Sequence, residues 1–328
     1  MDIAELARRT AAGERRALAR AITLVESARA DHRAQAVELL EMLPKDREAL
    51  RIGLSGTPGV GKSTFIESFG MMLTGRGLKV AVLAVDPSST RSGGSILGDK
   101  TRMDRLAREP AAFIRPSPSQ THLGGVARRS REAVALCEAA GFDVVLIETV
   151  GVGQSETVVA EMSDVFLLLL APAGGDELQG VKRGIMEIAD MIVVNKADGD
   201  LKSAAQRTCA DYAGALRLLR KRPQDPDGFP RAVMVSALEE HGLDKVWQDL
   251  NELTDWRRDN GFWNRTRKDQ ARYWFHQEVK NAVLAQLETP EARAALAEFA
   301  EKVASGDMAP GAAASVFLSE LDMRRTAK

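Results

Sequence analysis

The chain has 328 residues, a formal net charge of -1 and a sequence pI of about 6.5. This length suffices for one large α/β domain with smaller additions, and the balanced charge, with no basic block, gives no indication of a nucleic-acid partner. The two cysteines, Cys137 and Cys209, form no Cys-x-x-Cys pair, so we expect small buried side chains instead of a disulfide framework.

The N-terminal 48 residues are predicted to be helical. Apolar residues recur at helical spacing, as at Leu18 and Ile22, residues 28–31 indicate a break between two helices, and Pro44 ends the second. The acidic start of the chain does not resemble a signal peptide. The longest strongly apolar run, residues 165–171, is far shorter than the roughly 20 residues of a membrane helix. We therefore expect a cytoplasmic protein without membrane association.

From residue 50 onward, short apolar runs alternate with helical stretches. The runs are almost continuously apolar, which is typical of strands buried on both faces of a parallel sheet. Helical segments between such strands give βαβ units, so we predict an α/β fold with a mostly parallel central sheet. The predicted strands are residues 52–55, 80–85, 144–147, 165–170, 191–194 and 232–235.

The first predicted strand leads into a glycine-rich loop that matches the phosphate-loop pattern G-x-x-x-x-G-K-[ST] and precedes a predicted helix. Its backbone N–H groups and the positive end of the helix are suited to bind phosphate. We expect Lys62 to contact the β and γ phosphates as a catalytic residue, and the Ser63 hydroxyl to bind Mg²⁺. The predicted nucleotide-binding loop consists of Gly56, Thr57, Pro58, Gly59, Val60, Gly61, Lys62, Ser63 and Thr64.

The second predicted strand ends at Asp86, and a polar Ser- and Gly-rich stretch separates this residue from Asp99. Such a loop is suited to become ordered only when γ phosphate and Mg²⁺ are present. We expect Asp86 to position the attacking water and both acids to join the Mg²⁺ shell. The alternative for Asp99 is a helix-capping or solvated loop acid.

The third predicted strand ends in Glu148, and Gly151 follows shortly after. An acidic residue here can reach Mg²⁺ directly or through water, and the Gly151 N–H can approach the γ phosphate. Common GTPases have Asp at this position, and the longer Glu148 side chain favours contact through water. No glutamine directly follows Gly151, where many GTPases place a water-positioning residue. We therefore expect slow intrinsic hydrolysis that a partner accelerates.

The sequence Asn195-Lys196-Ala197-Asp198 follows the strand at 191–194. A carboxylate can accept two hydrogen bonds from guanine, whereas adenine lacks this donor pair and would leave the acceptor unpaired. We therefore expect Asp198 to select GTP and GDP, Lys196 to lie over the base and Asn195 to tie loops together. The loop expected to close over the guanine consists of Ser236, Ala237 and Leu238.

After residue 240 the predicted elements are all helices. They cover residues 243–256, 268–287, 291–304 and 310–323, and all four tryptophans of the chain lie here. Two explanations of these aromatic residues stay open: core packing, or an oligomer interface, where aromatic side chains are enriched. We place the domain boundaries at 1–48 for a helical N-terminal extension, 49–255 for a P-loop GTPase domain and 256–328 for a helical C-terminal segment.

Together, the motifs resemble the methylmalonyl-CoA mutase-associated GTPases, metallochaperones of adenosylcobalamin enzymes. The resemblance extends over about residues 13–275 and is carried by GERRALARAITLVES, GTPGVGKST, VDPSSTRSGGSILGDKTRM, LIETVGVGQSE, APAGGDELQGVK, NKAD and VSAL. It implies a P-loop NTPase fold with helical extensions, Glu in place of Asp at 148, and a homodimer to which the C-terminal arm, 256–328, contributes. It also implies an adenosylcobalamin-dependent methylmalonyl-CoA mutase as partner, whose cofactor delivery and protection are gated by GTP.

The loop at residues 171–182 is expected to carry the switch signal to that partner, since it leaves the strand 165–170 near the nucleotide and contains two glycines and several charges. Its expected signalling residues are Asp176, Gln179 and Lys182. The alternative is an ordinary strand-to-helix connection. The chain has no base-off histidine motif, so we expect no direct cobalamin binding.

Three other functions compete with this one. A metal-insertion GTPase, for example for nickel, would usually carry clustered metal ligands, whereas the four histidines are scattered. A transport-linked ATPase or a small-molecule kinase would not need the motif at Asn195–Asp198. A purely structural dimer would need neither Lys62 nor Ser63.

Overall fold

The computed structural model describes residues 2–27, 29–85, 103–116, 123–149, 155–172 and 183–326. The chain divides into two compact units, residues 1–268 and 269–328. Within the described ranges, no helix is both long enough and apolar enough to cross a membrane.

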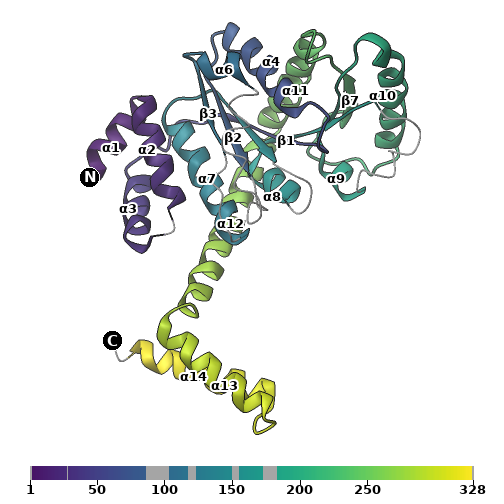
Figure 1. Cartoon of the computed structure of the whole chain (residues 1–328). Coiled ribbons are helices and arrows are strands. Elements are labelled where there is room, and N and C mark those ends of the chain that lie inside the picture. The colour runs from purple at the N-terminus through teal and green to yellow at the C-terminus, as the bar shows by residue number, and fades with distance from the viewer. Residues whose placement is uncertain are drawn as a thin grey trace. The chain divides into compact units, whose positions relative to one another are not determined.

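The first unit contains a seven-stranded sheet whose strands all run parallel to their neighbours, in the order β3-β2-β4-β1-β5-β6-β7 (Figure 1). This arrangement confirms the predicted α/β fold with a parallel central sheet. The strands are β1 (Leu50–Ser55), β2 (Val80–Val85), β3 (Ala112–Arg115), β4 (Val144–Thr149), β5 (Val165–Leu170), β6 (Met191–Val194) and β7 (Arg231–Met234).

Strand β3 was not predicted from the sequence. It has only four residues, lies at the edge of the sheet and pairs with β2 alone. Its outer half, Ile114 and Arg115, is only partly buried. Its short apolar run begins with two alanines, which are depleted in strands, and ends at the charged Arg115, so the sequence gives only a weak strand signal.

Helices cover both faces of the sheet, as parallel topology requires. Alternate residues of β1, such as Ile52 and Leu54, share one apolar core with α4, α6 and α11, whereas α7 and α8 pack on the opposite face (Figure 1). These helices and their neighbours are α4 (Lys62–Gly75), α6 (Asp104–Arg108), α7 (Leu123–Ala139), α8 (Ser155–Met162), α9 (Arg183–Ile188), the 3₁₀ helix η3 (Gly199–Leu201), α10 (Lys202–Arg217) and α11 (Leu243–Asp259).

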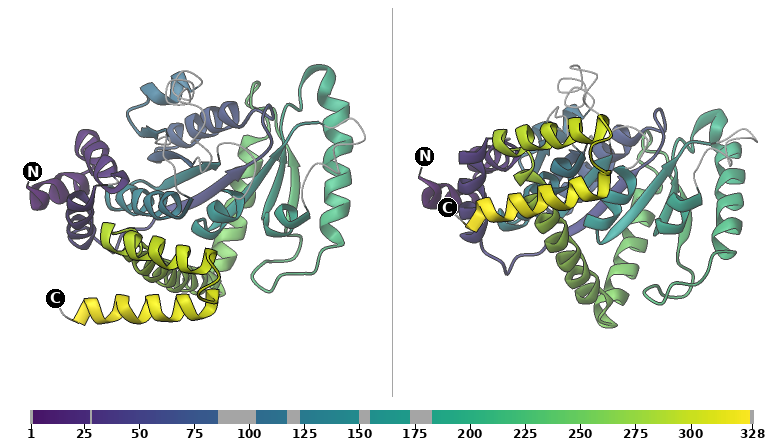
Figure 2. Two further views of the ribbon diagram at one scale, coloured as in Figure 1. Left: turned by 60° about the horizontal axis from the view of Figure 1, so that its bottom comes forward. Right: turned by 90° about the horizontal axis from the view of Figure 1, so that it is seen from below.

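Three N-terminal helices, α1 (Ile3–Ala11), α2 (Arg15–Glu26) and α3 (Ala30–Glu41), pack on one another and on α7, beside which they lie in Figure 2. The Arg47 guanidinium joins the ends of two helices, because its Nη1 donates to the carbonyls of Ala11 at 2.8 Å and Ala139 at 2.7 Å. A cation is favourable at a helix C-terminus, where carbonyls lack partners within the helix. The N-terminal helices thus belong to the same compact unit as the sheet.

Aspartates immediately before three strands fix the amino edge of the sheet. In each case one carboxylate oxygen accepts the backbone N–H of a residue in or just before the adjacent strand. Asp143 accepts from Lys79 at 2.7 Å, Asp164 from Arg51 at 2.9 Å, and Asp190 from Phe166 at 2.8 Å. Each bond holds two neighbouring strands in register at their first residues.

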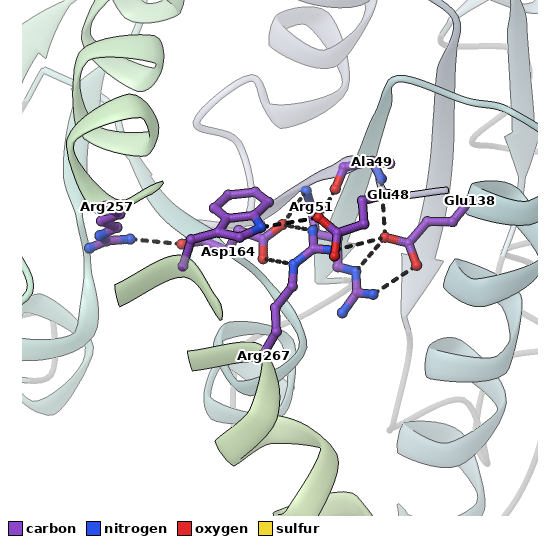
Figure 3. A network of polar contacts seen from close by, with 8 residues as sticks. Glu48, Ala49, Arg51, Glu138, Asp164, Arg257 and Arg267 are labelled. Atoms are coloured by element: carbon purple, nitrogen blue, oxygen red, sulfur yellow. Dashed lines mark hydrogen bonds and ion pairs between the residues drawn. The ribbon is translucent and has the colours of Figure 1, made fainter. Parts of the chain in front are cut away.

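Two of these aspartates also hold arginines from the last helices of the unit, and Figure 3 shows the contacts of Asp164. Arg267, on α12 (Phe262–Gln286), donates to the Asp164 carboxylate at 2.6 and 2.9 Å. Arg257, at the end of α11, donates to Asp190 and Asp225, each at 2.6 Å, and to the Asp164 carbonyl at 2.7 Å. Burial alone would lower the pKa of Arg257, but the two carboxylates outweigh it and raise this pKa above its ordinary value, so the guanidinium stays charged.

The second unit contains the rest of α12, then α13 (Pro290–Ala304) and α14 (Pro310–Thr326). Its own apolar core is small and centres on Phe299, Ala313 and Phe317. In the first unit, Trp263 is buried in the main core and Trp247 packs against it, which supports core packing for these two tryptophans. The division after residue 268 lies within α12, and the boundaries predicted at 48 and 255 stay predictions.

Candidate nucleotide site

The predicted phosphate loop connects β1 to α4 at the carboxyl edge of the sheet. Gly61 has φ +88° and is the N-cap of α4, which starts at Lys62 as predicted. A Cβ atom at Gly61 would lie 2.7 Å from Nδ2 of Asn195, so a side chain would displace the asparagine. Gly59 has nearly the same φ, +87°, but a Cβ atom there would meet nothing within 4 Å. The loop is thus tightly packed at one glycine and has open space at the other.

Lys62 and Ser63 begin α4, where the first N–H groups have no acceptor within the helix. The Lys62 Nζ donates to the Gly56 carbonyl at 2.6 Å, so the ammonium lies over its own loop. A cation and N–H groups that have no acceptor within the helix form a suitable environment for phosphate oxygens.

Asn195 joins the three predicted nucleotide-binding loops. It follows β6, and its side chain is 2% exposed. Its Nδ2 donates to the carbonyls of Val60 at 3.0 Å and Gly61 at 3.3 Å, and its Oδ1 accepts the Ala237 N–H at 3.0 Å. One buried carboxamide therefore connects the phosphate loop to both loops predicted to surround the guanine.

Asp198 and Ser236 lie together beside this junction. The Ser236 hydroxyl donates to Oδ2 of Asp198 at 2.5 Å and accepts the Glu239 N–H at 3.0 Å. A carboxylate has about four lone-pair positions, so this bond leaves Asp198 able to accept two more from guanine. Lys196 has φ +57°, and its Cε would lie 3.8 Å from a Cβ at Gly61, close to the phosphate loop. Leu238 is 76% exposed at the end of the predicted base loop.

Glu148 is buried in β4, in register between Leu54 of β1 and Ala84 of β2. It thus lies between the strand that enters the phosphate loop and the strand that leads to Asp86. The next residue, Thr149, donates to the Ser55 hydroxyl at 3.1 Å, which joins the ends of β4 and β1. The predicted residues that lie outside the described ranges are Asp86, Asp99, Gly151, Asp176, Gln179 and Lys182.

Of the four predicted Mg²⁺ ligands, the structure therefore describes only Ser63 and Glu148. Across the described ranges, no group of three or more His, Cys, Asp or Glu side chains is arranged to hold a metal ion. Neither cysteine is poised as a nucleophile, because burial raises the pKa of both the Cys137 and Cys209 thiols.

One contact to the base loop was not predicted. The hydroxyl of Ser68, a buried residue of α4, donates to the Ala237 carbonyl at 2.7 Å. It ties the helix of the phosphate loop to the loop at residues 236–238. A serine in a helix gives no local signal for such a bond, because its partner lies 169 residues away in the chain.

Comparison with known proteins agrees with this arrangement. The sequence model of the family described as "Methylmalonyl Co-A mutase-associated GTPase MeaB" matches residues 18–292, which is most of the chain. The chain belongs to this family. Its members are P-loop GTPases, so the family supports guanine-nucleotide binding and the resemblance drawn from the motifs is confirmed.

Similar relatives cover nearly the whole chain. A protein of Caulobacter vibrioides named "Putative GTPase" is 52% identical, with 97% of this chain and 98% of the relative covered. "GTPase ArgK" of Escherichia coli is 50% identical over 87% and 86% of the two chains. The mouse "Methylmalonic aciduria type A homolog, mitochondrial" is 47% identical over 95% and 78%.

A solved structure is also similar in fold. It is described as "Crystal structure of LAO/AO transport system kinase", has a TM-score of 0.73 and 39% identity, and the match covers 99% of this chain and 97% of that one. Proteins similar to this chain thus include both named GTPases and one named as a transport kinase.

The contact between Gly61 and Asn195 gives a prediction for the nucleotide-free protein. Gly61→Ala should lower the free energy of unfolding by roughly 2–5 kcal/mol, since a left-handed alanine costs about 1–2 kcal/mol and unpaired buried amide groups about 1–3 kcal/mol. Gly59→Ala has the same backbone cost but space for its Cβ, so it should lose only about 1–2 kcal/mol. Urea denaturation measures both variants, and equal losses would contradict the role of the Asn195 contact.

Proposed function

We propose that the protein binds and hydrolyses GTP, and that the state of the nucleotide controls a partner enzyme. The observation that carries this proposal is the junction at Asn195, where one side chain holds the phosphate loop and both predicted base loops together. In this proposal Asp198 accepts hydrogen bonds from guanine, Lys196 lies over the base, and the loop at 236–238 closes over it. Selectivity follows because adenine would leave the Asp198 acceptor unpaired.

Hydrolysis in this site depends on positioning and on charge neutralisation. Lys62 and the first N–H groups of α4 would neutralise the β and γ phosphates, and the open space beside Gly59 suits phosphate oxygens. Mg²⁺, when bound, neutralises phosphate charge. Its proposed ligands are Ser63 and Glu148, with Asp86 and Asp99, and the hydroxyl and carboxylates are the oxygen donors that Mg²⁺ prefers. Asp86 is proposed to orient the attacking water.

The proposed partner is an adenosylcobalamin-dependent methylmalonyl-CoA mutase. The family description names association with this mutase, and a relative 47% identical is named for methylmalonic aciduria. The protein would gate cofactor delivery and protect the mutase, with Asp176, Gln179 and Lys182 as signalling residues and without contacting cobalamin itself. A cytoplasmic location is part of this proposal.

A second function, a transport-linked ATPase or small-molecule kinase, is favoured by the name given to the solved structure at 39% identity. The two functions differ in the base they require. The bond from Ser236 to Asp198 supports guanine, because a second polar group orients the carboxylate that adenine cannot use.

Asp198→Asn tests the base assignment. Asparagine presents an N–H₂ group to the edge at which guanine also presents donors, so GTP affinity should fall at least tenfold. Xanthosine triphosphate carries an acceptor at this edge of its base and should gain affinity. Competition against a fluorescent nucleotide measures both changes, with ATP as the reference. Unchanged GTP affinity, or preference of the original protein for ATP, would contradict the GTPase proposal.

Turnover with and without the mutase tests the partner. We expect GTP hydrolysis to be slow alone and at least tenfold faster with the mutase, since partners accelerate well-studied GTPases by up to about 10⁵-fold. Lys62→Ala serves as the inactive control. Pull-downs with GTP, with GDP and without nucleotide should recover an acyl-CoA mutase. Equal turnover in both conditions together with no recovered mutase would rule out this partner.

The proposed homodimer is supported by the exposed face of α12. Phe275, Val279 and Val283 recur every four residues, so they share one side of the helix, and they are 65%, 46% and 53% exposed. Such a row of apolar side chains within the second unit suits a second copy of the chain.

Val279→Asp should therefore shift the protein from dimer to monomer in light scattering, because a buried unpaired carboxylate opposes association. The matched control is Leu218→Asp, since Leu218 is 88% exposed at the end of α10, outside this helix. The proposed interface would be contradicted if the unmodified protein is a monomer, or if the Val279→Asp variant is still a dimer.

A further inference from the structure

Two non-glycine residues in the described parts of the chain have positive φ: one lies on a predicted base loop, and the other lies just beyond the predicted loop at 236–238. Lys196 has φ +57° and Glu240 has φ +56°. The first belongs to the guanine motif, but Glu240 has no assigned role. A left-handed backbone is unfavourable for a residue with a long side chain, and such positions cluster at functional sites. The contacts of the Glu240 side chain should therefore explain why this residue keeps an unfavourable backbone conformation.

The loop that carries Glu240 is closed on itself. Ser236 and His241 exchange both backbone hydrogen bonds at 3.0 Å, and the Glu239 N–H donates to the Ser236 hydroxyl at 3.0 Å. Gly242 completes the loop with φ +80°, where a Cβ would lie 2.6 Å from the Met234 carbonyl. In so short a closed loop, the position of Glu240 constrains the position of Ser236.

The Glu240 side chain is held by Arg105, whose Nη1 donates to its Oε1 at 2.6 Å. The hydrogen bond and the charge of Glu240 raise the pKa of Arg105. Arg105 is itself held against α4. Its backbone N–H donates to Oε1 of Glu67 at 2.7 Å, and the next residue, Leu106, is fully buried against Gly70. Glu67 and Gly70 are both on α4, the helix that begins at Lys62.

We propose that Glu240 and Arg105 are positioning residues for guanine recognition. Arg105, anchored on the helix of the phosphate loop, holds Glu240, and the closed loop then keeps the Ser236 hydroxyl on Asp198. The pair thereby aligns the Asp198 carboxylate with both donors of guanine, without itself contacting the base. This inference rests on the proposed role of Asp198 in binding guanine.

The strength of the effect follows from exposure. The side chains of Arg105 and Glu240 are 59% and 48% exposed, so solvent screens their attraction. Exposed ion pairs of this kind contribute about 0.2–1 kcal/mol, which corresponds to at most about a fivefold change in a rate or affinity. At 1 M salt the screening length falls to about 3 Å, which is close to the 2.6 Å of this ion pair, so its contribution should shrink.

The test compares dissociation rates of fluorescent GDP and fluorescent inosine diphosphate, which lacks the 2-amino donor. The variants are Arg105→Met, Glu240→Gln, which leaves the backbone strain in place, and the two combined. Arg105→Lys keeps the charge and should restore part of the effect. The control is Arg76→Met, which breaks a comparably exposed pair with Asp244 at 2.5 Å, between the end of α4 and the start of α11.

We expect each single variant to release GDP about two- to fivefold faster at low salt and to change inosine diphosphate release less, so that discrimination between the two nucleotides shrinks. The double variant should be no worse than either single one, Arg76→Met should have no effect, and 1 M NaCl should reduce the differences. Unchanged discrimination, or additive effects in the double variant, would overturn the pairing while leaving GTP binding intact. Equal release of GDP and inosine diphosphate by the unmodified protein would overturn the role of Asp198 as well.

Discussion

The carboxylate of Asp164 is the interaction on which most of the first unit depends. The carboxylate accepts the backbone N–H of Arg51 at the start of β1 and two N–H groups of Arg267 on α12. The backbone carbonyl of Asp164 accepts an N–H group of Arg257. A buried charge is tolerated only when it is paired and hydrogen-bonded, and removing one partner typically costs about 3–5 kcal/mol. Asp164 therefore fixes the register of β1, the amino edge of the sheet and the start of α12 at one point.

The two edges of the sheet consequently differ in chemistry. The amino edge holds charges that compensate one another, including Glu138, which accepts from Arg51 at 2.7 and 2.9 Å. Among the described residues, the carboxyl edge is joined by neutral side-chain bonds to backbone groups, from Asn195 and Ser68. Neutral bonds of this kind contribute about 1 kcal/mol each. The amino edge thus supports the sheet, whereas Lys62 and Asp198, which we propose bind the nucleotide, lie at the opposite edge.

Sequence alone predicted the features whose signal is local. Six strands followed from apolar runs, the phosphate loop from its glycine spacing, and the junction at Asn195 from its place after a strand. Strand β3 was missed because its short apolar run begins with alanines and ends at Arg115. The arginine–carboxylate network was missed for another reason: Arg267 and Asp164 lie 103 residues apart, and in the sequence each is indistinguishable from an ordinary surface residue.

The same distinction explains why the guanine motif was recognisable and the role inferred for Glu240 was not. Asn195 and Asp198 belong to one short motif, in which only Asp198 is proposed to contact the base, so their spacing is visible within one loop. Glu240 and Arg105 are 135 residues apart, and their pairing depends on how α6 packs on α4. A group that touches the ligand is constrained by the ligand, whereas a group that positions it is constrained only by the fold. The positive φ of Glu240 reflects this constraint from the fold, and it can be recognised only in the structure.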